Sequence, residues 1–165
     1  MREPSRSALL AAGLAAWWCF LAVDFVLHAS VFAAWWQATA TYWLPPEQLF
    51  ARIPVGYAAF ALYVGALLWL LRRLHGSRPA PGVAAGFGLR AGVLAGTTWA
   101  LATYSVFAMP PSALLVWAGS LALESMVAAG VSAWVLAGAR AGRRALLAGA
   151  AGLLGFVLGV VLQNL

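Results

Sequence analysis

The side chains that could do chemistry in this sequence are few, and two of them stand close together in the stretch VDFVLH, residues 23–28. Residues four apart share one face of a helix, so the carboxyl group of Asp24 can touch the imidazole of His28. A second acid, Glu124, sits alone in another apolar run. Two carboxyl groups and an imidazole can pass a proton between them, or can offer oxygen and nitrogen ligands to a metal ion.

The composition indicates the medium in which these residues lie. Of the 165 residues, 64% are hydrophobic and only 8% are charged, against about 25% charged residues in a soluble domain. A globule with so few charges cannot cover its surface with groups that water solvates, so we expect a protein whose solvent is lipid. The net charge of +6 comes from arginines clustered between apolar runs, which indicates membrane topology and no nucleic-acid partner.

The apolar runs predict an all-α, polytopic transmembrane bundle formed by residues 1–165 as one membrane domain. Five spans are expected, at about residues 8–36, 54–71, 87–109, 112–139 and 145–162. The first four would form the core. The fifth is rich in glycine and short, so a re-entrant segment is the alternative. Its Gly155 and Gly159 have a spacing that allows close helix approach.

The arginines indicate how the chain crosses the membrane. Nine of the ten fall on one side if the N-terminus is inside, and Arg52 alone falls on the other. This asymmetry predicts a multi-pass protein of the cell inner (plasma) membrane with its N-terminus in the cytoplasm. Trp35, Trp36, Tyr42 and Trp43 would then form an aromatic belt at the outer boundary.

Residues 39–54 are the longest segment on the predicted outer side. Pro45 and Pro46 suit the first turn of a helix, and Glu47 adds an acid where a helix N-terminus is positive. We therefore expect a short interfacial helix that leads into the second span. None of the five expected spans has an internal proline.

Depth within the membrane brings the titratable groups together. A rise of about 1.5 Å per residue from the expected outer boundary places Asp24 roughly 18 Å, His28 roughly 12 Å and Glu124 roughly 20 Å deep. We therefore expect the three to converge in one intramembrane cluster. Polar residues of the two middle spans that could join it are Thr97, Thr98, Tyr104, Ser105, Ser120 and Ser125.

Several interpretations of this cluster are open. A charge at the centre of a membrane helix costs about 2.5–3.5 kcal/mol on insertion scales, so the three groups should face the protein interior and pair. They could form a structural network that fixes helix register, or a proton relay or ion-coupled transport site. They could also form a metal site with Asp24, His28 and Glu124 as ligands, or a contact for a partner subunit or lipid.

Other chemistries lack the residues they need. The absence of lysine excludes a Schiff base, and the single cysteine, Cys19, excludes an internal disulfide. His75 lies in an expected inner loop, so it cannot join His28 as a second ligand of haem b. We predict no cofactor, and the sequence favours a protein that is not an enzyme.

The leading functional hypothesis is a small membrane protein for proton- or ion-coupled transport, in which a homo-oligomer would enlarge the small bundle. The first alternative is an accessory or assembly subunit of a larger membrane complex, which the lack of a proline-broken helix mildly favours. The second alternative is an intramembrane metal-dependent enzyme. The bilayer is the one partner that all three hypotheses share.

The sequence also resembles a group of small, functionally uncharacterised bacterial integral membrane proteins with four helices. The resemblance covers the first four expected spans and rests on three features, which are Asp24-x-x-x-His28, the segment ATATYWLPPEQLFARIP at 38–54, and an acid in the fourth helix. The matching positions are Asp24, His28, Trp43, Pro46, Glu47 and Glu124. The resemblance implies a four-helix core in a bacterial inner membrane and carries no activity. The fifth span departs from the pattern of the group.

Overall fold

The structure, a computed structural model, describes residues 3–38, 44–138 and 140–164. Over these residues the chain is all-helical, as the apolar runs predict. The elements in chain order are α1 (Arg6–Val26), the π-helical segment η1 (Leu27–Val31), α2 (Ala33–Ala38), α3 (Pro46–His75), α4 (Pro81–Val106), α5 (Pro111–Leu136) and α6 (Ala141–Gln163).

Four helical stretches are long and apolar enough to cross a membrane. They are Arg6–Val31, Glu47–His75, Pro111–Leu136 and Ala141–Gln163. The α4 helix has the length for a span, at 26 residues, but does not belong to this set. Its apolar character is diluted by Arg90 and by several glycines and threonines. The described residues therefore form a helical bundle with four helices of membrane-spanning character, and the span expected at 87–109 stays a prediction.

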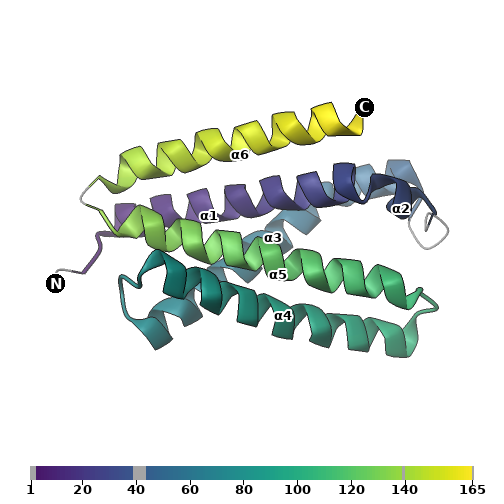
Figure 1. Cartoon of the computed structure of the whole chain (residues 1–165), viewed down its shortest axis with the longest axis horizontal. Helices are drawn as coiled ribbons and strands as arrows, with labels where there is room; N and C mark the ends of the chain where they lie inside the picture. Colours follow the sequence, from purple (N-terminus) through teal and green to yellow (C-terminus); the bar gives the residue numbers. More distant parts are fainter. Residues whose placement is uncertain (1–2, 39–43, 139, 165) are drawn as a thin grey trace.

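The helices run back and forth between two ends of the bundle (Figure 1). The N-terminus and the turns α3–α4 and α5–α6 lie at one end, and the turn α4–α5 and the C-terminus lie at the other. We call the first the arginine-rich end, because seven described arginines belong to the segments there. They are Arg6, Arg72, Arg73, Arg78, Arg140, Arg143 and Arg144. Arg52, near the start of α3, belongs to the opposite end.

The helix boundaries correct three expectations. The interfacial helix expected within residues 39–54 is not a separate element, because α3 runs unbroken from Pro46 to His75. Pro54 therefore lies inside this helix, contrary to the expectation that no span has an internal proline. A helix can tolerate one proline, because neighbouring groups take up the backbone bond it loses. The α6 helix is continuous over 23 residues, so it lacks the chain reversal that a re-entrant segment needs.

The first expected span is also interrupted. Residues 8–36 were expected as one α-helix. The α-helix ends at Val26 instead, and the chain continues as the π-helical segment η1 and the short helix α2. No proline or glycine marks this change in the sequence.

The closest helix pair is α4 and α5, which form a hairpin across the short connection between Val106 and Pro111. A Cβ atom at Gly92 would lie 2.7 Å from the Cα of Ala122, and one at Gly96 would lie 2.8 Å from the Cα of Ala118. Real side chains do not approach so closely. Small residues on both helices thus let the backbones touch, which is how helices associate where lipid removes the hydrophobic driving force.

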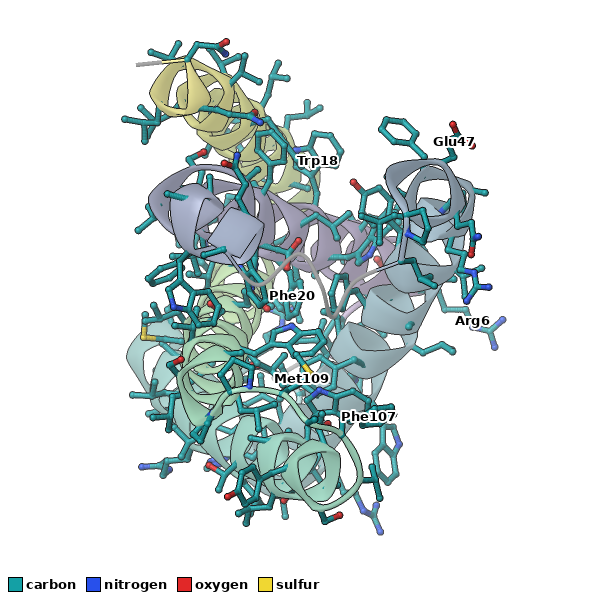
Figure 2. The ribbon with its side chains drawn as sticks, turned by 90° about the vertical axis from the view of Figure 1, so that its right-hand side faces the viewer. Arg6, Trp18, Phe20, Glu47, Phe107 and Met109 are labelled. Carbon is teal, nitrogen blue, oxygen red and sulfur yellow. The ribbon has the colours of Figure 1, made fainter. Side chains whose placement is uncertain are left out.

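The α1 and α6 helices are joined by side chains of α1 that reach the backbone of α6. The Trp18 Nε1 donates to the carbonyl of Gly149 at 3.1 Å, and the Cys19 thiol donates to that of Ala148 at 3.4 Å. Figure 2 shows Trp18 between the two helices. Gly152 leaves room for its indole ring. Gly159 similarly faces the ring of Phe25, so the glycine spacing of α6 serves close packing, as expected.

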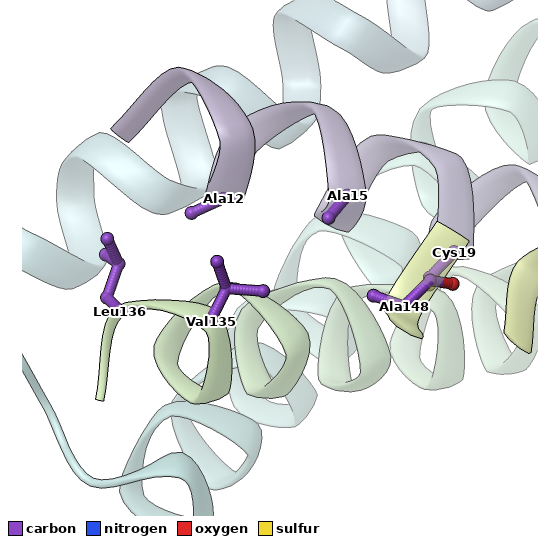
Figure 3. Close-up of a cluster of buried hydrophobic side chains, with 6 residues drawn as sticks. All are labelled: Ala12, Ala15, Cys19, Val135, Leu136 and Ala148. Atoms are coloured by element: carbon purple, nitrogen blue, oxygen red, sulfur yellow. The ribbon is translucent and has the colours of Figure 1, made fainter. Parts of the chain in front are cut away.

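Small buried side chains form the meeting point of α1, α5 and α6. Figure 3 shows this cluster, which comprises Ala12, Ala15, Cys19, Val135, Leu136 and Ala148. A second cluster around Phe20, Val64 and Ala128 joins α1, α3 and α5. Both α1 and α5 take part in the two clusters, and α5 also packs against α4, so α5 is the central helix of the bundle.

Replacing Gly92 by alanine should loosen the α4–α5 pair. The added methyl group would meet the backbone of α5, and overpacking of this kind typically costs about 1–3 kcal/mol. We expect a lower midpoint of thermal unfolding in detergent for Gly92→Ala. Gly86→Ala on the same helix is the matched control, since a Cβ there meets nothing within 4 Å and alanine gains about 1 kcal/mol in helix propensity. Equal midpoints for the two variants would contradict the close approach.

Candidate functional site

The end of the first long helix is wound as a π-helix, and this winding positions His28. The amide of Phe32 donates to the carbonyl of Leu27, five residues back, at 2.8 Å. At the start of the turn, the amide of Leu27 is shared by the carbonyls of Val23 and Asp24. The hydroxyl of Ser30 donates to the Gly159 carbonyl at 2.8 Å, which fastens the segment to α6. Single π turns of this kind often occur at functional sites.

Asp24, His28 and Glu124 come together as the depth count predicts, and we call them the triad. The Nδ1 of His28 lies 3.1 Å from the Oδ1 of Asp24 and 4.0 Å from the Oε1 of Glu124. One nitrogen or oxygen atom from each of the three side chains lies within 4.8 Å of the others. Two elements of the first long helix and the middle of α5 supply these groups.

Glu124 is the most deeply buried member of the triad, with only 2% of its surface exposed. The side chains of Asp24 and His28 keep 24% and 20% of theirs. Neither the Oε1 of Glu124 nor the Nε2 of His28 has a hydrogen-bond partner among the described residues. A buried carboxyl oxygen without a donor is costly, so this group requires a proton of its own, a cation, or a charged imidazole beside it.

The neighbours of His28 determine which ring nitrogen carries the proton. The Nδ1 lies 3.0 Å from the backbone carbonyl of Asp24 as well as close to the carboxylate. A carbonyl oxygen can only accept a hydrogen bond. The Nδ1 must therefore hold a proton, and the Nε2 is the nitrogen that is free to gain or lose one.

A chain of tryptophan rings begins next to His28. The ring of Trp36 lies 5.2 Å from the imidazole and 6.1 Å from the ring of Trp117. Trp117 in turn lies 6.0 Å from Trp99 on α4. Trp36 thus packs inward, where an aromatic belt was expected. The ring of Trp35, a second expected member of that belt, lies 5.0 Å from the ring of Trp36. Tyr42 and Trp43, the remaining two, lie outside the described residues.

Two of the expected supporting serines lie on α5 next to Glu124. Ser120 is buried one turn before it, and its hydroxyl has no hydrogen-bond partner among the described residues. The Ser125 hydroxyl donates to the carbonyl of Leu121 at 2.6 Å and lies 2.8 Å from the hydroxyl of Tyr63. Ser125 therefore links α5 to α3.

The other expected supporting residues are not brought to the triad. Tyr104 is 59% exposed on α4. The exposed Ser105 donates to the carbonyl of Ala102 in its own helix. Thr97 and Thr98 are on an exposed face of α4 as well. Tyr104 and Ser105 lie near the α4–α5 turn, where Tyr104 lines the same pocket as Pro111. Glu124 instead lies at the level of Gly88 and Gly92.

The expected outer-loop residues have different outcomes. Trp43 lies outside the described residues, and Pro46 begins α3. Glu47 is exposed in the first turn of α3 and points away from the bundle (Figure 2). Neither described position contributes to the triad.

Tyr63 and Trp117 were not among the residues expected near the triad, and Trp36 was expected only at the membrane boundary. A signal for Tyr63 existed, because it is a tyrosine in the middle of an apolar run, away from the interface where tyrosine usually lies. Trp117 and Ser120 precede Glu124 at helical spacings, which would place them on the same side of α5.

No protein-family model, no curated protein and no solved structure matches this chain. The resemblance to small bacterial four-helix membrane proteins therefore stays a prediction. The site has to be interpreted from its own geometry.

The proton of His28 can be tested by nitrogen NMR. In a His75→Gln variant, labelled with ¹⁵N-histidine, the one remaining signal pair belongs to His28. Because Nδ1 faces acceptors only, we expect it to be protonated both in the neutral and in the charged ring. A neutral ring with its proton on Nε2 would contradict the geometry.

Proposed function

We propose that this chain is an integral membrane protein that takes up and releases a proton at the triad, coupled to the transport of an ion or small solute. The observation that carries the proposal is the orphaned Oε1 of Glu124, buried in the middle of α5 and facing the Nδ1 of His28 at 4.0 Å. Ionisable residues within membrane helices typically mark ion and proton pathways.

Each of the three side chains of the triad would have a different role. Asp24 holds the imidazole at 3.1 Å and balances its charge when the ring is doubly protonated. His28 faces both carboxyl groups through one nitrogen, so a small shift of its ring changes its partner. Glu124, the most buried, would be the group whose protonation changes during a transport cycle. The 3.1 Å between Asp24 and His28 is within the reach of general acid–base groups, and the 4.0 Å between His28 and Glu124 would have to shorten for a direct hydrogen bond.

The membrane arrangement belongs to the same proposal. We infer that α4 crosses the membrane in addition to the four candidate spans, which makes five spans. The glycines of α4 hold its backbone against α5 along the bundle. The arginine-rich end would face the cytoplasm by the positive-inside rule. The N-terminus would then lie inside, and the resemblance to small bacterial membrane proteins favours a bacterial inner membrane.

A metal ion is the second candidate occupant of the triad. The grouping of one imidazole and two carboxyl groups within 4.8 Å supports it, since such donors bind iron or zinc. The contact of Nδ1 with the Asp24 carbonyl favours the proton instead, because a metal bound at Nδ1 would have to displace the hydrogen that this carbonyl accepts.

Proton movement can be measured in vesicles that contain the purified protein and an internal pH dye, with a potassium gradient and valinomycin as driving force. We expect faster acidification with the native protein than in protein-free vesicles. Glu124→Gln and Asp24→Asn should reduce the rate to the protein-free level, because each removes an exchangeable carboxyl proton. Glu47→Gln is the matched control and should keep the native rate, since Glu47 is exposed at the end of α3.

Other outcomes would redirect the proposal. Native rates in all variants would contradict a role for the triad in proton movement. Absence of flux in the native protein, together with a heteromeric mass in native mass spectrometry, would favour an accessory subunit of a larger complex. Bound metal that disappears in His28→Ala would favour the metal site.

A further inference from the structure

A basic cavity lies at the turn between α5 and α6, at the arginine-rich end and far from the triad. Its volume is about 410 Å³. The residues that line it are Trp134, Gly138, Arg140, Arg143, Arg144 and Leu147. Three arginines around one cavity present an unusually high positive charge to whatever enters it.

One of these arginines is held in place by the protein. The Nη1 of Arg144 donates to the carbonyl of Trp134 at 2.7 Å, and its guanidinium carbon lies 5.5 Å above the indole ring of the same residue. A Cβ at Gly138 would come within 2.7 Å of that carbon, so a glycine is needed for Arg144 to lie there. The contact with Trp134 uses one of five guanidinium N–H donors, which leaves the others for a ligand.

No acidic side chain among the described residues neutralises this charge. Glu3 pairs with Arg72 at 3.6 Å, Asp24 and Glu124 belong to the triad, and Glu47 lies at the other end of α3. The α6 helix begins at Ala141, and Arg140 before it provides no side-chain cap. Its free first-turn amides therefore add a partial positive charge to the same end.

The cavity also has an apolar side. Leu147, 52% exposed, lines it one turn into α6, and Leu146 beside it is 77% exposed. An anionic group at the arginines would thus have hydrocarbon surface directly next to it. This combination of charge and apolar surface matches a phosphate ester that carries acyl chains, and basic pockets between membrane helices bind such headgroups.

We propose that this cavity is a binding site for a phosphate group, held by Arg140, Arg143 and Arg144. Arginine binds phosphate oxygens through paired N–H donors, which makes it the side chain best suited to this ligand. The phosphate belongs either to an anionic phospholipid or to a free solute, and the chemistry at the arginines is the same for both. The site is independent of the proton exchange proposed at the triad.

Native mass spectrometry of the full chain in mild detergent tests the site, with phosphatidylglycerol as the probe and phosphatidylcholine as the neutral-headgroup comparison. We expect one phosphatidylglycerol to stay bound to the native protein. Arg143→Gln should weaken its binding about tenfold, the effect of losing a charge-assisted hydrogen bond. Arg73→Gln is the matched control, an exposed arginine at the same end of the bundle but outside the cavity, and it should bind as the native protein does.

Three results would overturn the proposal. The first is an equal loss of phosphatidylglycerol binding in Arg143→Gln and Arg73→Gln, which would indicate diffuse attraction to positive charge. The second is equal binding of phosphatidylglycerol and phosphatidylcholine. The third is that neither a lipid nor inorganic phosphate binds to the native protein. Unchanged thermal unfolding of Arg143→Gln excludes misfolding as the cause of lost binding. Displacement of the lipid by millimolar inorganic phosphate would identify a soluble phosphate as the ligand, and resistance to displacement would identify the lipid.

Discussion

Close approach between helix backbones is the constraint on which the rest of this structure depends. Lipid offers no hydrophobic gain for bringing two helices together, so the interfaces need small residues and hydrogen bonds across them. The α5 helix contacts the glycines of α4 on one side and buried alanines of α1, such as Ala16, on the other. Glu124 lies between these contacts, and their tightness is what keeps lipid away from its carboxyl group.

The apolar runs predict the helices well, because a membrane demands long stretches of apolar residues and leaves little choice of secondary structure. They predict boundaries and breaks less well. The α3 helix begins at Pro46 rather than at residue 54, since a helix can continue through polar residues and past Pro54 where the composition resembles a loop. The π turn at Leu27–Val31 has no such signal, because VDFVLHASVF has the pattern of an uninterrupted apolar helix.

The candidate site, like the fold, could be predicted from the sequence only in part. Spacing along one helix predicts the contact of Asp24 with His28, and a count of residues from the boundary predicts the level of Glu124. Depth alone does not tell which way a side chain points around its helix. Thr97 lies further inside α4 than Tyr104 but is on an exposed face. Tyr63, which bonds to Ser125, has no motif that would connect the two across the bundle.

The π turn gives the first long helix a property that an ordinary helix lacks. It holds one residue more than an α turn, so it rotates the residues after it by about 100° relative to an unbroken α-helix. Trp36 follows His28 by eight residues, which an unbroken α-helix would place about 80° apart around the helix axis. The extra residue brings the two back to nearly the same side, so the π turn is what sets the tryptophan ring 5.2 Å from the imidazole.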